Sequence, residues 1–314
     1  MKIPGVTYPD TRRWKGAVEV ISKLQTEGES AYLVGGCVRD ILLNIPEPGD
    51  YDIATSSPVE KTLQLFPAAG RLGIKYGVLT IDYLEFKYQI AIFRRDDPAS
   101  DGRRPEKIYP AGLEEDSRRR DFTVNAIYFD PNNEEFRDPQ GGIPDLRQGI
   151  LRIIGEPVRR LREDHLRILR AVRFASRFNF DIDPESAAAL ENCAGMVADL
   201  SPDRIRDEIS RIFIEGNKKY AVQLLHLWGI LSILWKFLEI DVSHDFFKEI
   251  TSAIEQSGCD NSNRCWAAFF QPLFLELGIK AVDRALLKLS FPRKDKKTIR
   301  ELLLSNEWIA TGKK

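Results

Sequence analysis

Hydrophobic and polar positions divide the chain into a first part with mixed strand and helix patterns and a second part with helical patterns alone. In the first part, a helical pattern over residues 1–30 is expected to support the first strand. The polar segment 94–112 contains three prolines and two glycines and is expected to form a long loop of the kind that often carries function. Strands are expected at residues 31–34, 51–54, 77–83, 86–93, 126–129 and 134–137, and helices at 37–43, 58–66 and 114–125.

Strand patterns disappear after about residue 155. Leu166, Leu169 and Val172 recur at the three- to four-residue spacing of a core-facing helical stripe. Aromatic residues gather in the last third of the chain, and in a helical domain such residues usually form the core. Helices are expected near residues 157–178, 184–198, 202–215 and 218–227, with several more up to 308. The two patterns together predict an α+β protein.

Length and charge limit the possible functions. A chain of 314 residues is long for one core, so two or more domains are expected. The formal charge of -1 gives no overall sign of nucleic-acid binding, so any RNA contact would depend on local basic clusters. Such clusters occur at residues 118–120, 159–162 and 294–297, although charged runs are more often solvated surfaces.

Cysteine and histidine usage argues against several kinds of site. The three histidines do not support a three-histidine metal site or a histidine-based catalytic triad. No signal peptide or long apolar span is recognised, so a cytoplasmic protein without membrane contact is expected. The four cysteines lack the CxxC spacing of zinc sites and are expected to be reduced thiols: Cys37, Cys193, Cys259 and Cys265.

The segment 33–55 carries the most specific chemistry. Gly35 and Gly36 open a helix, where backbone N–H groups can approach an anion such as a phosphate. Asp50 and Asp52 follow at the start of a strand, and strand residues two apart point to the same face. Two close carboxylates repel each other unless a cation lies between them, and oxygen ligands suit Mg²⁺. The alternative is a pair of ordinary surface aspartates.

Arg39 follows the glycine pair on the same helix. Its guanidinium is expected to reach the same region and to bind phosphate oxygens in a bidentate manner. The alternative is a structural ion pair with Asp40 or another acid.

A second cluster extends over residues 119–126. Arg120 could neutralise a triphosphate, and Asn125 could bind a ribose hydroxyl. Asp121 suits a helix N-cap or first-turn position. Without the first motif, this cluster would be interpreted as a capped helix with a solvated basic start.

A third cluster combines Asp164 with Arg167, Arg170 and Arg173 along one side of an expected helix. An aspartate accepts and an arginine donates, so Asp164 and Arg167 match the pairing edges of both cytosine and adenine. Uracil and guanine present the reverse order and would leave polar groups unpaired, at a cost of roughly 1–3 kcal/mol each. The alternative is a set of salt bridges on a structural helix.

These clusters, in this order and spacing, resemble the motifs of class II nucleotidyltransferases, the family of tRNA CCA-adding enzymes and bacterial poly(A) polymerases. The similarity extends over roughly residues 30–215. The matching segments are GGCVRD with DYDIAT nine residues later, SDGRRP (100–105), RRDFTVNA (119–126), DPQGGIPDL (138–146) and EDHLRILRAVRF (163–174).

The resemblance implies a fold and a set of site residues. It implies a nucleotidyltransferase head with a small mixed sheet (1–152), a helical nucleotide-selecting neck (153–215) and a helical RNA-binding body with a shortened tail (216–314). It also implies that Asp50 and Asp52 bind a catalytic metal ion, expected to be Mg²⁺. The implied nucleotide contacts, together with those inferred above, are Gly35, Gly36, Arg39, Arg120, Asp121, Asn125, Asp164, Arg167, Arg170 and Arg173. The implied flexible loop contains Asp101, Arg103 and Arg104.

The implied activity is template-independent addition of CMP and AMP from CTP and ATP to the 3′ end of tRNA. Partial addition (CC only or A only), poly(A) synthesis and a catalytically idle RNA-binding homologue remain alternatives. Gln89 lies where many members carry an acidic residue near the metals, which bears on metal binding. The sequence does not indicate the oligomeric state.

Overall fold

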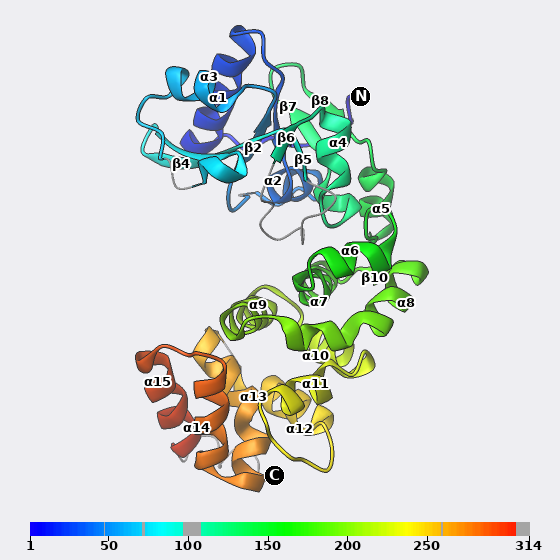
Figure 1. Cartoon of the computed structure of the whole chain (residues 1–314), viewed down its shortest axis with the longest axis vertical. Coiled ribbons are helices and arrows are strands. Elements are labelled where there is room, and N and C mark those ends of the chain that lie inside the picture. The colour runs from blue at the N-terminus through cyan, green and yellow to red at the C-terminus, as the bar shows by residue number, and fades with distance from the viewer. Residues whose placement is uncertain (47, 71–72, 97–107, 259, 306–314) are drawn as a thin grey trace. The chain divides into compact units, whose positions relative to one another are not determined.

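The computed structural model describes the chain except for residues 47, 71–72, 97–107, 259 and 306–314. It divides into two compact units, Met1–Glu156 and Pro157–Lys314, drawn in blue to green and in green to red in Figure 1. The proposed division into head, neck and body, with its boundaries at 152–153 and 215–216, stays a prediction.

A six-stranded mixed sheet organises the first unit. Its strand order is β3-β4-β2-β1-β7-β8, with β2 and β4 parallel and the other neighbouring strands antiparallel. The strands are β1 (Ala31–Val34), β2 (Asp52–Thr55), β3 (Val78–Tyr83), β4 (Phe86–Ile92), β7 (Tyr128–Asp130) and β8 (Glu135–Arg137). All six were expected from the sequence, and their bounds differ from the expected ones by at most two residues.

The two faces of this sheet have different roles. On one face Leu33, Ile53 and Ile90 are fully buried, and α1 (Arg12–Thr26) packs beside the sheet (Figure 1). Gly16 permits this close packing, because a Cβ atom there would lie 3.1 Å from the ring carbon Cζ of Tyr88. The expected support of the first strand by an N-terminal helix is therefore confirmed.

The opposite face presents polar side chains along one row of paired residues. The register pairs Val34 with Asp52, Asp52 with Gln89, and Gln89 with Thr80 across four neighbouring strands. Because paired residues in adjacent strands share a face, Asp52 and Gln89 lie next to each other on the same side of the sheet.

The expected helix over residues 114–125 was wrong. α4 (Leu113–Arg118) ends early, and a 3₁₀ turn (Thr123–Asn125) follows after an extended residue, Phe122. The Asp121 carboxylate accepts a hydrogen bond from the Phe122 backbone N–H at 2.8 Å, which competes with helical bonding. The chain then pairs with a later segment, since Thr123 N–H donates to the carbonyl of Arg152.

The ends of the expected loop at 94–112 also differ from the prediction. β5 (Arg94–Asp96) pairs antiparallel with β6 (Ile108–Pro110). The predicted loop residues Asp101, Arg103 and Arg104 lie outside the described residues. Two short helices, α2 (Gly36–Leu42) and α3 (Val59–Leu65), match the expected 37–43 and 58–66 closely.

The DPQGGIPDL segment has a structural role at α5 (Gly142–Gln148). Both carboxylate oxygens of Asp138 accept backbone N–H groups at the start of this helix, from Gly142 at 2.7 Å and Ile143 at 2.9 Å. The buried Asp145 accepts the Thr123 hydroxyl at 2.7 Å. α5 is thereby fixed against the segment that carries the second predicted cluster.

Substituting Gly142 with alanine is expected to destabilise the protein by about 3 kcal/mol. A Cβ atom at this position would overlap the carbonyl group of Thr123, whose carbon would be only 2.7 Å away. A decrease in the denaturant midpoint, measured by circular dichroism, tests this. Gly141→Ala is the control, because a Cβ atom at this neighbouring position meets no atom within 4 Å. Any loss of stability in this variant measures the strain of a positive φ alone. Equal stability of Gly142→Ala and the unsubstituted protein would contradict the packing argument.

The second unit is helical, apart from the two-residue extended segment Asp181–Ile182. Its helices are α6 (Pro157–Glu163), α7 (Leu166–Phe178), α8 (Pro184–Cys193), α9 (Pro202–Glu215), α10 (Lys218–Leu227), α11 (Ile230–Phe237), α12 (Phe247–Ser257), α13 (Ser262–Leu277), α14 (Ile279–Lys288) and α15 (Arg293–Leu304).

The single helix expected over 157–178 was wrong, because the chain breaks at Asp164 and His165. The Asp164 carboxylate accepts the Leu166 backbone N–H at 3.3 Å and so favours a new helix start. The expected 184–198 helix likewise continues only as a 3₁₀ helix beyond Cys193.

An aromatic core confirms the prediction for the last third of the chain. Trp235, Trp266 and Phe269 are buried, and the rings of Trp235 and Phe269 stack with centroids 5.2 Å apart. Cys193 and Cys265 are buried in this unit, as Cys37 is in the first unit, whereas Cys259 lies outside the described residues. Among the described helices, none alone is long and apolar enough to cross a membrane. α10 and α11 meet that criterion only as a pair bent by 80°.

Candidate active site

A small pocket of about 180 Å³ lies in the first unit on the polar face of the sheet. Asp52 and Gln89 contribute from β2 and β4, and three arginines also line the pocket: Arg94, Arg119 and Arg120. The pocket therefore combines one carboxylate with several positive charges. Such a lining favours a ligand that carries both a cation and a polyanion.

Asp52 is the carboxylate in this pocket. Burial raises the pKa of Asp52 to about 6, and the nearby charge of Asp50 adds to this, while Arg120 acts in the opposite direction. The charged form is therefore disfavoured by its surroundings in the absence of a ligand. A cation bound here would remove that penalty, which is the behaviour expected of a metal ligand.

Asp50 occupies a different environment from Asp52. It precedes β2, its side chain is 85% exposed, and it accepts a hydrogen bond from Arg13 Nη2 at 2.6 Å. Its charge still acts on Asp52, so the two carboxylates interact as the sequence suggested. Within the described residues, no group of three or more histidine, cysteine, aspartate or glutamate side chains is arranged to hold a metal ion. The metal role of the pair stays a prediction.

Asp116 organises the arginines of the pocket and was missed by the sequence reasoning. It is completely buried and accepts hydrogen bonds from Arg119 Nη2 at 2.7 Å, Arg120 Nη2 at 3.0 Å and the Tyr128 hydroxyl at 2.6 Å. Burial acts to raise the pKa of Asp116, but the two arginines and the tyrosine hydroxyl outweigh it and lower that pKa. The spacing of three and four residues from Asp116 to the arginines was the available signal.

Arg120 lies between this network and Asp52. Its Nε donates to the Tyr128 hydroxyl at 3.0 Å, and its positive charge acts on the Asp52 carboxylate. A Cβ atom at Gly35 would lie 3.8 Å from Arg120 Nη1 and 3.9 Å from Asp52 Oδ2. Gly35, with a φ of 80°, therefore places the glycine turn beside the pocket, as the sequence predicted.

The remaining predicted residues of the first unit form a buried network. Arg39 donates to Asp40 Oδ1 at 2.7 Å and to Asn125 Oδ1 at 2.5 Å, and Asn125 donates to Asp121 at 3.1 Å. Arg39 is only 2% exposed. The structure thus brings the segment 33–55 and the second cluster, residues 119–126, together. It also shows the Arg39–Asp40 ion pair, which was the structural alternative to phosphate binding by Arg39. Phosphate contact by Arg39, Gly36, Asp121 or Asn125 stays a prediction.

In the second unit, the predicted base-reading residues make ion pairs. Asp164 accepts from Arg204 Nη2 at 3.0 Å, and Arg167 lies 3.5 Å from Glu163. Both carboxylate partners of Arg173 come from α9, Glu208 at 2.6 Å and Glu215 at 3.0 Å.

Arg170 lies over the ring of Phe174 at 5.2 Å. The ion pairs of Asp164, Arg167 and Arg173 correspond to the salt-bridge alternative. Asp164 and Arg167 also lie near the break between α6 and α7. Nucleotide contact by any of the four stays a prediction.

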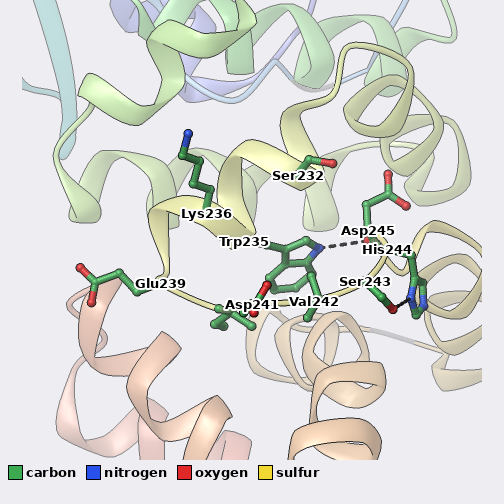
Figure 2. A pocket seen from close by; sticks show the side chains of 10 residues that line it. Ser232, Trp235, Lys236, Glu239, Asp241, Val242, Ser243, His244 and Asp245 are labelled. Carbon is green, nitrogen blue, oxygen red and sulfur yellow. Dashed lines mark hydrogen bonds between the residues drawn. The ribbon is translucent and has the colours of Figure 1, made fainter.

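A larger pocket of about 530 Å³ in the second unit contains none of the predicted site residues (Figure 2). It lies along the segment that follows α11, where Trp235 Nε1 donates to the carbonyl of Asp245 at 3.0 Å. Its lining mixes Lys236 with Glu239, Asp241 and Asp245. Size alone therefore does not identify the chemical site in this protein.

Comparison with known proteins identifies the family. Residues 31–152 match the model described as "Poly A polymerase head domain", and residues 179–241 match "Probable RNA and SrmB- binding site of polymerase A". The chain is 33% identical over 288 residues to a CCA-adding enzyme of Streptococcus sanguinis, an alignment that covers 91% of this chain and 70% of that protein. This chain belongs to the family of CCA-adding enzymes and bacterial poly(A) polymerases. The family resemblance inferred from the motifs is thereby confirmed.

Two further relatives show the range of the family. A CCA-adding enzyme of Geobacillus stearothermophilus is 40% identical over 219 residues, covering 69% of this chain and 54% of the relative. Poly(A) polymerase I of Haemophilus influenzae is 33% identical over 235 residues, covering 71% of this chain and 52% of the relative. The chain therefore spans little more than half the length of these two proteins.

Solved structures agree with the α+β fold. A CCA-adding enzyme of Bacillus stearothermophilus in complex with CTP superposes with a TM-score of 0.78 at 29% identity, covering 95% of this chain and 71% of that one. A Thermotoga maritima CCA-adding enzyme complexed with tRNA gives a TM-score of 0.69 at 22% identity, covering 93% and 70%, and is similar in fold. Membership of a nucleotidyltransferase family implies general use of a divalent metal ion.

Proposed function

We propose that the protein transfers CMP and AMP from CTP and ATP to the 3′ end of tRNA without a nucleic-acid template. The observation that carries this proposal is the pocket that Asp52, with its raised pKa, lines together with Arg119 and Arg120. Its relatives include several CCA-adding enzymes. We place this reaction in the cytoplasm, where tRNA is processed.

Asp50 and Asp52 are the proposed ligands of the metal ion, which we assign as Mg²⁺. The donor set fits this ion, because both groups are hard carboxylate oxygens and their mutual repulsion contributes to the raised pKa of Asp52. Asp50 is exposed and held by Arg13, so it can exchange that partner. When bound, the ion would stabilise the negative charge that develops as a 3′-hydroxyl attacks the α-phosphorus of the nucleoside triphosphate.

The arginines of the pocket are proposed to neutralise the triphosphate. Arg119 and Arg120 are already oriented by Asp116, so they need little rearrangement when negative charge builds up on the leaving pyrophosphate. The tyrosine hydroxyl of Tyr128 fixes Arg120 from another side. Preorganised positive charge of this kind stabilises the transition state more than flexible surface arginines would.

Base selection is assigned to Asp164 and Arg167 in the second unit. The aspartate accepts a hydrogen bond and the arginine donates one, which matches the donor and acceptor groups that cytosine and adenine share on their pairing edges. Asp164 pairs with Arg204 in this structure, and each side chain is 21% exposed. To bind a base, Asp164 must therefore give up its ion pair with Arg204 or share its carboxylate between Arg204 and the base.

Asp164→Ala is expected to reduce the preference for CTP and ATP over UTP and GTP by about tenfold or more, because it removes a hydrogen-bond acceptor. The measurement is kcat/KM for each nucleoside triphosphate on a tRNA that lacks CCA. Asp199→Ala is the matched control, since Asp199 is a 68% exposed carboxylate in the same unit. Unchanged selectivity in Asp164→Ala would restrict this residue to its ion pair with Arg204.

Primer extension on three tRNA substrates tests the proposed function. The substrates end before CCA, after CC and after the complete CCA, and each receives CTP and ATP separately and together. Full CCA addition predicts C addition to the first, A addition to the second and no extension of the third. Extension of only one of the first two substrates indicates a partial CC- or A-adding enzyme.

A second candidate is poly(A) synthesis, which the Haemophilus influenzae relative supports. Repeated AMP addition to the completed CCA end would favour it over CCA addition. RNA binding without any incorporation would instead indicate an idle RNA-binding homologue.

A further inference from the structure

The pocket of the first unit has an unusual charge balance for a metal site. Among the described residues that line it, Asp52 is the only acidic one, and three are arginines: Arg94, Arg119 and Arg120. Asp116 forms ion pairs with Arg119 and Arg120 and so neutralises part of their positive charge. A bare divalent cation that enters this pocket therefore meets one carboxylate and several positive groups.

An acidic residue at the position of Gln89 would offset part of this positive charge. Gln89 is the register partner of Asp52 in the neighbouring parallel strand, and both residues line the same pocket. The Gln89 side chain is exposed, and its amide makes no hydrogen bond within the part of the chain that the structure describes. Its neutral amide can offer an oxygen to a ligand but adds no negative charge.

The second carboxylate near the pocket is already engaged. Asp50 accepts a hydrogen bond from Arg13 at 2.6 Å, so a metal ion must compete with a guanidinium for it. No cluster of three metal-binding side chains exists among the residues that are described. Both observations indicate that the protein alone offers a divalent ion a weak site.

We propose that Gln89 makes metal binding conditional on the nucleotide: the arginine-lined pocket binds the triphosphate first, and the divalent ion enters with the negative charge that the phosphates supply. This proposal rests on the proposed function, because it takes the ligand to be a nucleoside triphosphate. A carboxylate in place of Gln89 would supply the missing charge from the protein itself. It would therefore strengthen binding of the bare ion and oppose binding of the bare triphosphate.

Two calorimetric titrations of the full chain test this proposal. In the first, MnCl₂ is added without nucleotide, and Gln89→Glu is expected to bind the ion about tenfold or more tightly than the unsubstituted protein. In the second, CTP is added in the presence of EDTA, and Gln89→Glu is expected to bind CTP about fivefold or more weakly. Opposite changes in the two titrations would not result from a merely structural effect.

Gln148→Glu is the matched control. Gln148 is exposed at the end of α5 and does not line the pocket, so the same substitution there changes the net charge equally without changing the site. Both affinities of this variant are expected to equal those of the unsubstituted protein. Thermal unfolding of all three proteins verifies that each is folded.

Two results would overturn the role of Gln89. One is tight binding of MnCl₂ to the unsubstituted protein without nucleotide, and the other is unchanged metal affinity in Gln89→Glu. Failure of the proposed function is distinguishable, because it would show as absence of CTP binding by the unsubstituted protein in the second titration. The metal titration without nucleotide is read independently of that result.

Discussion

Asp52→Asn is expected to lower the rate of nucleotide incorporation about a thousandfold or more. The substitution keeps the size of the side chain and removes the negative charge that would hold the metal ion beside the triphosphate. Single-turnover incorporation of CMP from CTP into a tRNA lacking CCA, with saturating Mg²⁺, measures this effect. A variant that incorporates CMP at the normal rate would contradict the assignment of Asp52.

The same substitution is not expected to destabilise the protein. The pKa of Asp52 is raised to about 6 in the folded protein, above the ordinary value of 3.8, chiefly by burial. The folded state therefore disfavours the ionised carboxylate, and the resulting loss of stability develops as the pH rises from about 4 through about 6. Asp52→Asn lacks this titration. At pH 7 without metal, its melting temperature is expected to equal or exceed that of the unsubstituted protein.

Asp116→Asn is expected to cost about 3–5 kcal/mol of stability, because it leaves two partly buried guanidinium groups without their carboxylate. Asp116 is fully buried and contacts Arg119, Arg120 and Tyr128 together. Urea denaturation at pH 7, followed by circular dichroism of the full chain, measures the loss. Glu114→Gln on the same helix is the matched control, since Glu114 is exposed and its removal is expected to change stability by less than about 0.5 kcal/mol.

The stabilising effect of Asp116 depends on pH in a defined direction. Its pKa is lowered in the folded protein from the ordinary value of 3.8, since the arginines and Tyr128 outweigh burial. The contribution is therefore complete above about pH 4 and is lost as the pH falls through the lowered folded value. The stability difference between the unsubstituted protein and Asp116→Asn should narrow below pH 4. Equal stability of the two proteins at pH 7 would contradict the central place of Asp116 in the site.

The sequence predicted the strands of the sheet because these depend on local patterns. The approach of the first two clusters, in which Arg39 contacts Asn125 86 residues away, was implied by the family resemblance. The strand patterns identified β1 and β4, and the two-residue spacing predicted that Asp50 and Asp52 share one face. The motif comparison placed Gln89 near the predicted metal site, and the register now pairs it with Asp52.

The parts that failed depend on contacts between distant residues or on short polar interruptions. The break at Asp164 is invisible to periodicity, because apolar residues continue on both sides of it in α6 and α7. Arg173 pairs with Glu208 and Glu215, which are 35 and 42 residues away, and no local pattern specifies such partners. The role of Asp116 required knowledge that Tyr128 and two arginines meet it in the core.

A crystal structure of the protein with Mg²⁺ and an unreactive CTP analogue tests the central claim most directly. The account predicts a metal ion bound by Asp50 and Asp52, with the triphosphate against Arg119 and Arg120 in the pocket of the first unit. Binding of the triphosphate elsewhere in the protein, with Asp52 free of metal, would contradict it.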